Sequence, residues 1–143
     1  MNVKTKALVL AASMTVLSLP AGAATIVHVS LIGEEGGGMS IKADRPAVPA
    51  GDVVFAVTND AVGTAHELLV VRLVSKDQAL VVDPARHRID EKKVKVVGEV
   101  SDLKPRASRK LPLKLAAGEY RLVCNVHGHV DAGMTIPLSV EAK

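Results

Sequence analysis

The chain's single cysteine lies in a short segment near the C-terminus that also carries two histidines and a methionine. This segment, CNVHGHVDAGM, runs from Cys124 to Met134. A thiol, imidazoles and a thioether together are the donors that suit copper, and two histidines and one cysteine in a plane, with a weak axial methionine, form an electron-transfer site. One tight loop cannot surround a metal ion, so we expect a further histidine from elsewhere in the chain. His66 is the best candidate.

The first residues have the pattern of a secretory signal. Lys4 and Lys6 precede an apolar run over residues 7–19, and Ala-Gly-Ala at 21–23 is typical of a cleavage site. The run is too short for a comfortable membrane span, and we see no other apolar segment that is long enough. We therefore expect a signal peptide over residues 1–23, a mature domain over residues 24–143 without a membrane span, and a periplasmic location.

Length and charge indicate a single small domain without the excess of basic residues that is typical of nucleic-acid-binding proteins. Its 143 − 23 = 120 residues are enough for one domain with one core. The formal charge of +3 includes Lys4 and Lys6, which leaves 3 − 2 = +1 for the mature chain and gives no reason to expect nucleic-acid binding. Residues 86–110 hold nine Lys or Arg and four Asp or Glu, which we interpret as a solvated edge in preference to a docking patch. A single cysteine cannot form an internal disulfide.

Alternation of apolar and polar residues with a period of two dominates the mature sequence and predicts strands. Glycine and proline separate the alternating runs, and we find no long helical pattern, so an antiparallel β-sandwich is the expected fold. Residues 75–93 form the longest irregular stretch, which we expect to hold a short strand or helix. The predicted strands lie near residues 27–31, 53–57, 69–73, 94–100, 111–115, 120–124 and 136–140.

Such a fold would place the candidate ligands together. Cys124 shares a strand face with Leu122, so its sulfur should point inward at one end of the sandwich. His66 opens another strand after a loop over residues 59–65. If both loops lie at one end, the metal site assembles between them, on a rigid support that favours electron transfer.

These features resemble the cupredoxin family. The resemblance rests on AGDVVFAVTN at residues 50–59, AHE at 65–67 and GEYRLVCNVHGHVDAGM at 118–134, and so covers most of the mature chain. The C-x4-H-x4-M spacing is similar to that of the rusticyanin-like and sulfocyanin-like members. The resemblance implies a Greek-key β-sandwich of about seven to eight strands with one type 1 copper per chain. It also implies the ligands His66, Cys124, His129 and Met134.

The loop carries two histidines, and we expect only one of them to bind the metal ion. His127 could be a solvated residue, an indirect donor or a competing ligand, but the spacing of the family favours His129, whose outer ring edge we expect at the surface. Glu67 stands where many cupredoxins have Asn or Ser, and its backbone N–H could still bond the cysteine sulfur. His28 and His87 are expected to be surface residues.

The sequence therefore predicts an extracytoplasmic carrier of single electrons, not an enzyme. A multicopper oxidase needs many more histidines than five, and a dinuclear copper centre needs a second cysteine. We expect a monomer whose partner is a redox protein such as a cytochrome or an oxidase, met in weak and transient contacts. The alternative is a copper chaperone or buffer, in which the same ligands should form an open and labile site.

Overall fold

The computed structural model describes residues 22–143. The predicted signal peptide falls almost entirely on residues outside this range, so it stays a prediction. Within the part of the chain that the structure describes, no helix has the length and hydropathy that a bilayer span requires.

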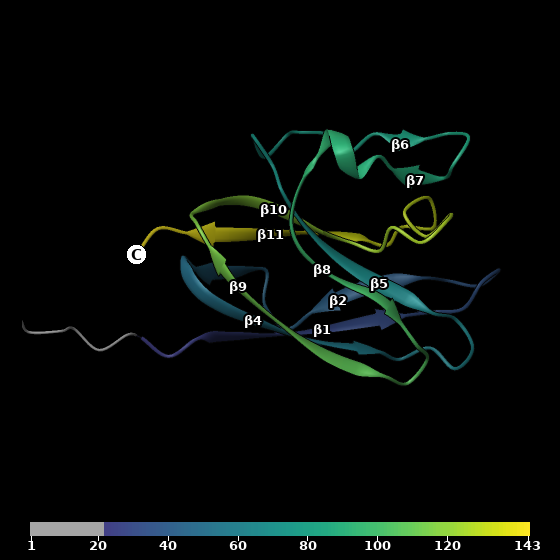
Figure 1. Ribbon diagram of the computed structural model, residues 1–143, viewed down its shortest axis with the longest axis horizontal. Coiled ribbons are helices and arrows are strands. Elements are labelled where there is room, and N and C mark those ends of the chain that lie inside the picture. Colours follow the sequence, from purple (N-terminus) through teal and green to yellow (C-terminus); the bar gives the residue numbers. More distant parts are fainter. Residues whose placement is uncertain (1–21) are drawn as a thin grey trace, which may run out of the picture.

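Two sheets pack face to face, as Figure 1 shows. Together they contain nine strands. The first sheet has the order β2 (Ser40–Ala43), β1 (Thr25–Ile32), β4 (Gly51–Asn59) and β9 (Ser108–Leu115). The second has the order β3 (Ala47–Pro49), β11 (Thr135–Glu141), β10 (Gly118–Val123), β5 (His66–Arg72) and β8 (Lys95–Leu103). The predicted β-sandwich is therefore confirmed.

The sheets differ from the expectation in two details. Strand β1 pairs in parallel with β4, and β3 pairs in parallel with β11, so both sheets are mixed and not purely antiparallel. The sandwich also has nine strands in place of seven to eight. The additional strands are short: β2 and β3 contain four and three residues, which is too few for alternation to reveal.

The core lies between the sheets and follows the predicted alternation. On β4, Val53, Phe55 and Val57 are buried and face the second sheet, while the residues between them are partly exposed. Tyr120 and Leu122 of β10 belong to the same cluster. Because period-two alternation places one face of each strand inside, these residues fix the orientation of β10 and hence of Cys124, which follows it.

Strand β5 is buried on both faces, which the sequence analysis did not anticipate. Leu68 and Val70 belong to the main core, whereas Leu69 and Val71 belong to a second cluster with Ile89. The segment that covers this outer face is the predicted irregular stretch. It contains a two-stranded hairpin and a single 3-10 turn, namely β6 (Val82–Asp83), β7 (Arg88–Ile89) and η1 (Glu91–Lys93).

Candidate metal centre

The candidate ligands meet at the pole of the sandwich where β10 ends and β5 begins, on the right in Figure 1. Cys124 directly follows β10, and its side chain is fully buried. His66 is the first residue of β5 and is paired with Leu103, the last residue of β8. The side chain of Asn59 donates to the carbonyl oxygens of Thr64 and Leu103, at 2.9 Å each, and so fixes the loop that precedes His66.

The loop after Cys124 returns to the sandwich at Met134. The Cys124 N–H donates to the Met134 carbonyl, and the Met134 N–H donates to the His129 carbonyl, both at 3.0 Å. Gly128 and Gly133 have φ values of 79° and 97°, a left-handed conformation that favours glycine. The loop therefore bends at both glycines. The Met134 side chain is fully buried beneath the loop.

Three donor atoms form a closed triangle. The Nδ1 atoms of His66 and His129 are 3.1 Å apart, and the Cys124 Sγ lies 3.7 Å and 3.3 Å from them, respectively. Metal bonds of about 2.0 Å to nitrogen and about 2.3 Å to sulfur would separate such donors by about 3.5 to 3.8 Å in a trigonal plane. The two imidazoles and the thiol therefore fit one metal ion after an outward movement of about a few tenths of an ångström.

Backbone groups fix the orientation of two of these side chains. His66 Nε2 lies 3.0 Å from the carbonyl oxygen of Gly33, and this bond leaves the lone pair of Nδ1 facing the other donors. The Glu67 N–H lies 3.3 Å from the Cys124 Sγ, as the sequence analysis inferred. Such contacts determine the tautomer and the direction of a ligand before the metal binds.

The position of His129 differs from the expectation. We expected its outer ring edge at the surface, but the residue is only 2% exposed. Its Nε2 atom is buried and has no hydrogen-bond partner within residues 22–143. The expectation came from the family resemblance alone, whereas in this chain the ring is buried beside that of His66, with the ring centroids 4.9 Å apart.

Glu34 fastens this loop to the pole. Its carboxylate accepts hydrogen bonds from the N–H groups of Val62 and Gly63 and from the Thr64 hydroxyl. These bonds lower the pKa of the Glu34 carboxyl, so the charged form that accepts them is favoured. The loops over residues 33–38 and 60–65 are thereby held together around His66, and the metal site is closed on that side.

Burial controls the protonation of the donor atoms. It raises the pKa of the Cys124 thiol to about 11, because the thiolate loses its hydration, although the Glu67 N–H partly offsets this effect. Burial also lowers the pKa of His129, with a further contribution from His66, and so favours the neutral ring. The pKa of the Glu67 carboxyl is raised for the same reason of desolvation. A metal ion must therefore displace the thiol proton, while the His129 ring is ready to bind.

The remaining histidines lie outside the triangle. His28 and His87 are exposed, as expected, and so is His127. The His127 ring lies against that of His87, with the ring centroids 5.2 Å apart. The grouped donors of the described chain are those of His66, Cys124 and His129. The structure thus brings together the donor atoms of three of the four predicted ligands. The fourth, Met134, is joined to Cys124 and His129 by backbone hydrogen bonds.

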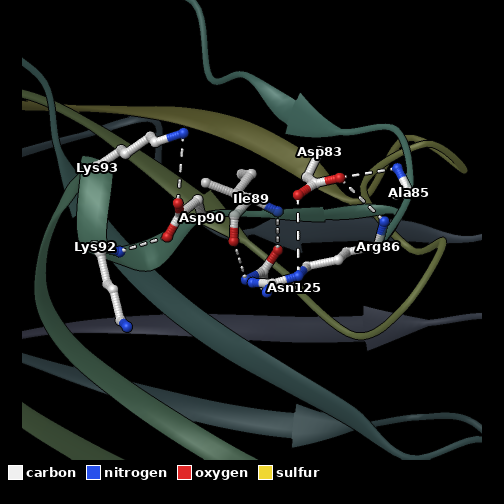
Figure 2. Close-up of polar contacts among 8 residues, drawn as sticks. All are labelled: Asp83, Ala85, Arg86, Ile89, Asp90, Lys92, Lys93 and Asn125. Atoms are coloured by element: carbon white, nitrogen blue, oxygen red, sulfur yellow. Dashed lines mark hydrogen bonds and ion pairs between the residues drawn. The ribbon is translucent and has the colours of Figure 1, made fainter.

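Sequence reasoning missed the residues that support the site. Gly33 and Glu34 lie far from the ligands in the sequence, and no motif marks them. Asn125 was also missed, although it follows Cys124 directly. Its side chain is buried and bonds to both backbone groups of Ile89 in β7, as Figure 2 shows. An amide beside a predicted ligand was the one available signal.

Comparison with solved structures identifies the fold. No family model and no curated protein matches the sequence. Auracyanin from Roseiflexus castenholzii, in its dithionite-reduced form, is 21% identical with a TM-score of 0.63, over 84% of this chain and 99% of that one. Auracyanin A from Chloroflexus aurantiacus, described as a blue copper protein, is 21% identical with a TM-score of 0.58, over 83% and 100%. Rusticyanin from Thiobacillus ferrooxidans is 19% identical with a TM-score of 0.59, over 84% and 79%.

The architecture is thus a mixed β-sandwich with two histidines and a cysteine grouped at one pole. This is the cupredoxin fold, shared with auracyanin and rusticyanin over 84% of this chain. The resemblance inferred from the sequence is confirmed at the level of the fold.

Proposed function

We propose that the protein is a type 1 copper protein that carries single electrons between redox partners. The observation that supports this proposal is the closed triangle of two imidazole nitrogens and one sulfur, with separations of 3.1 to 3.7 Å. This donor set suits copper in both oxidation states, and the bound copper would supply the one-electron couple. The proposed ligands are His66, Cys124 and His129, with Met134 as the weak axial ligand.

The protein's own residues would hold this geometry nearly constant during electron transfer. His66 and Cys124 lie at the ends of the paired strands β5 and β10, and the Gly33 carbonyl and the Glu67 N–H orient them. Because the supporting groups belong to the backbone of a packed sandwich, they resist movement when the charge of the metal changes. A small rearrangement favours fast electron transfer.

Burial of the site favours an electron carrier over a copper chaperone or buffer. His66, Cys124 and His129 are all buried, whereas a site that exchanges its ion should be open to solvent. The signal-like pattern of residues 1–23 supports a location outside the cytoplasm, most simply the periplasm. The proposed partners are redox proteins such as a cytochrome or an oxidase, and the proposed role of the protein is to carry electrons without turning over a substrate of its own.

A visible spectrum tests the proposal. Copper(II) added to the metal-free protein should produce an intense thiolate-to-copper charge-transfer band and a reversible one-electron couple. The Cys124→Ser variant should lose the band and keep the circular dichroism of the β-sandwich. Metal content must be measured in each preparation, since a site of cysteine and histidine also accepts zinc. A wild-type protein that binds copper and stays colourless would contradict the type 1 assignment.

A further inference from the structure

Two histidines and an aspartate lie together on the surface near the buried triangle. His87 Nδ1 is 2.8 Å from a carboxylate oxygen of Asp131, and both side chains are about half exposed, at 49% and 46%. The ring of His127 lies edge-on to that of His87, with centroids 5.2 Å apart and an angle of 64° between the planes. The proposed function uses none of these three residues.

The two exposed rings are arranged like the two rings of the buried centre. The rings of His66 and His129 have centroids 4.9 Å apart and an interplanar angle of 62°. The exposed pair differs from this by 0.3 Å and 2°. This spacing brings the two imidazoles within reach of one ion, and both side chains are exposed and free to turn a ring nitrogen toward it.

The backbone around His87 is held in place by the turn that joins β6 and β7. The carboxylate of Asp83 accepts from the N–H groups of Ala85 and Arg86, as drawn in Figure 2, and its carbonyl accepts from those of Arg86 and His87. His87 has a φ of 50°, a left-handed conformation that is uncommon outside glycine. The hydrogen bonds to Asp83 stabilise this conformation of His87.

The same residue is also joined to the proposed ligand loop. The His87 carbonyl accepts from the Gly128 N–H at 2.9 Å, and Gly128 lies between His127 and His129. One donor therefore comes from the hairpin and the other from the loop, and a backbone bond holds the two segments together. This arrangement lowers the conformational entropy cost of binding an ion, because the two segments are already held together.

We propose that His87 and His127 form a second, exposed site for a divalent first-row metal ion. Asp131 acts as the positioning residue. Its carboxylate accepts a hydrogen bond from His87 Nδ1–H and so leaves Nε2 free to bind, as carboxylates commonly do for metal-bound histidines. Water completes the coordination. Imidazole without a thiolate suits copper(II) and zinc(II), and copper(II) binds more tightly in the general order of affinities. The site stands independently of the proposed electron-transfer function.

An ion at this site would connect the hairpin to the loop at a residue two positions before His129. It would restrain the loop that carries two of the proposed copper ligands. The protein would thus hold a second metal in an open and exchangeable position, in contrast to the closed position of the buried centre.

Zinc titration followed by NMR of the imidazole groups tests the second site on the full chain. Zinc is the probe because it is diamagnetic and binds imidazole. We expect the signals of His87 and His127 to shift together and to saturate. His87→Gln and His127→Gln should each weaken this binding by at least about tenfold, and Asp131→Asn by about tenfold, the range found for partners of metal ligands.

Two controls separate this proposal from the alternatives. His28→Gln changes an exposed histidine outside the pair and should leave the titration unchanged. Cys124→Ser removes the thiol of the buried centre and should leave the shifts of His87 and His127 intact, so failure of the copper proposal does not affect the result. The second site is excluded if His28 shifts at the same zinc concentrations as His87, because the binding is then adventitious. It is also excluded if His127→Gln binds zinc at His87 as tightly as the wild type.

Discussion

The protonated thiol of Cys124 determines how metal binding depends on pH. Burial raises its pKa to about 11, so a metal ion that binds sulfur must release one proton at neutral pH. The fraction of thiolate rises tenfold per pH unit below that value, and the apparent affinity rises with it. The ring of His129 adds little to this dependence in the neutral range, because burial lowers its pKa and keeps it uncharged.

We therefore predict that the apparent copper(II) affinity increases about tenfold per pH unit between about pH 7 and 9. Competition with a chelator of known pH dependence measures this slope. The Cys124→Ser variant is the control, and its slope should be close to zero. An affinity of the wild type that does not change over this range would show that the sulfur is not a ligand.

A matched pair of substitutions tests which histidine of the loop completes the buried centre. His129→Gly should remove or strongly alter the charge-transfer band, because its Nδ1 lies 3.3 Å from the Cys124 sulfur. Added imidazole should restore the band by filling the vacated space. His127→Gly should keep the colour, since this side chain is exposed and points to His87. Loss of colour in the His127 variant alone would show that His127, and not His129, is the ligand.

At the residue scale, the sequence predicted which side chains would meet but not how they are covered. Cys124, His129 and Met134 could be selected because they lie in one local motif that resembles the cupredoxin family, and His66 because it opens a strand after a loop. The burial of His129 was not predictable in this way, because it depends on contacts made only in the folded pole, such as that with the His66 ring. The support of His66 by Gly33 was equally hidden, since Gly33 lies about thirty residues before it in the sequence. The role of each ligand in binding copper stays a prediction.

Among the elements, the segment between β5 and β8 supports the loop that follows Cys124. The amide of Asn125 accepts from the Ile89 N–H at 2.7 Å and donates to the Ile89 carbonyl at 3.0 Å and to the Glu91 carboxylate at 2.9 Å. Asn125 is almost fully buried, at 2% exposure. One side chain thus joins the hairpin to the residue directly after the proposed sulfur ligand.

Asn125→Ala should destabilise the protein by about 1 to 3 kcal/mol, because both backbone groups of Ile89 lose their partner in a buried position. Urea denaturation gives this value, and faster hydrogen exchange at the Ile89 amide should accompany it. Gln78→Ala removes an amide at the start of the same segment, where it bonds the Val74 N–H, and should cost about 0.5 kcal/mol or less because the site is exposed. Equal losses in the two variants would contradict a specific role for Asn125.

Strands with clear alternation were predictable, whereas the hairpin was not. On β4 the pattern of Val53, Phe55 and Val57 determines one inward face without reference to the rest of the chain. Strands β6 and β7 have two residues each, which is too short for alternation to show, and they depend on contacts with Asn125 and with the outer face of β5. The one sequence feature that indicates this covering segment is the continuous apolar run of β5, in which Leu69 and Val71 face outward and are buried.

For the whole molecule, the proposed metal centre lies on a core that does not require an ion. The main cluster joins apolar residues of both sheets, from Val29 and Phe55 to Leu122 and Leu138, and most of it lies away from the donor atoms. Small zinc domains differ, because without their ion they lack a sufficient core and unfold. Here the sheets and their pairing should form first and present the donors together.

We therefore predict that the metal-free protein keeps its circular dichroism spectrum and a cooperative thermal transition. A bound ion stabilises only the folded state, by about 2.7 kcal/mol when the free ion is at a hundred times its Kd. For a domain of this size that corresponds to a rise in Tm on the order of 10 °C. Calorimetry with and without a chelator measures the difference, and Cys124→Ser should show a much smaller rise, because the triangle has lost its sulfur. If the chelated protein were unfolded instead, the ligands would have to be counted among the groups that hold the two sheets together.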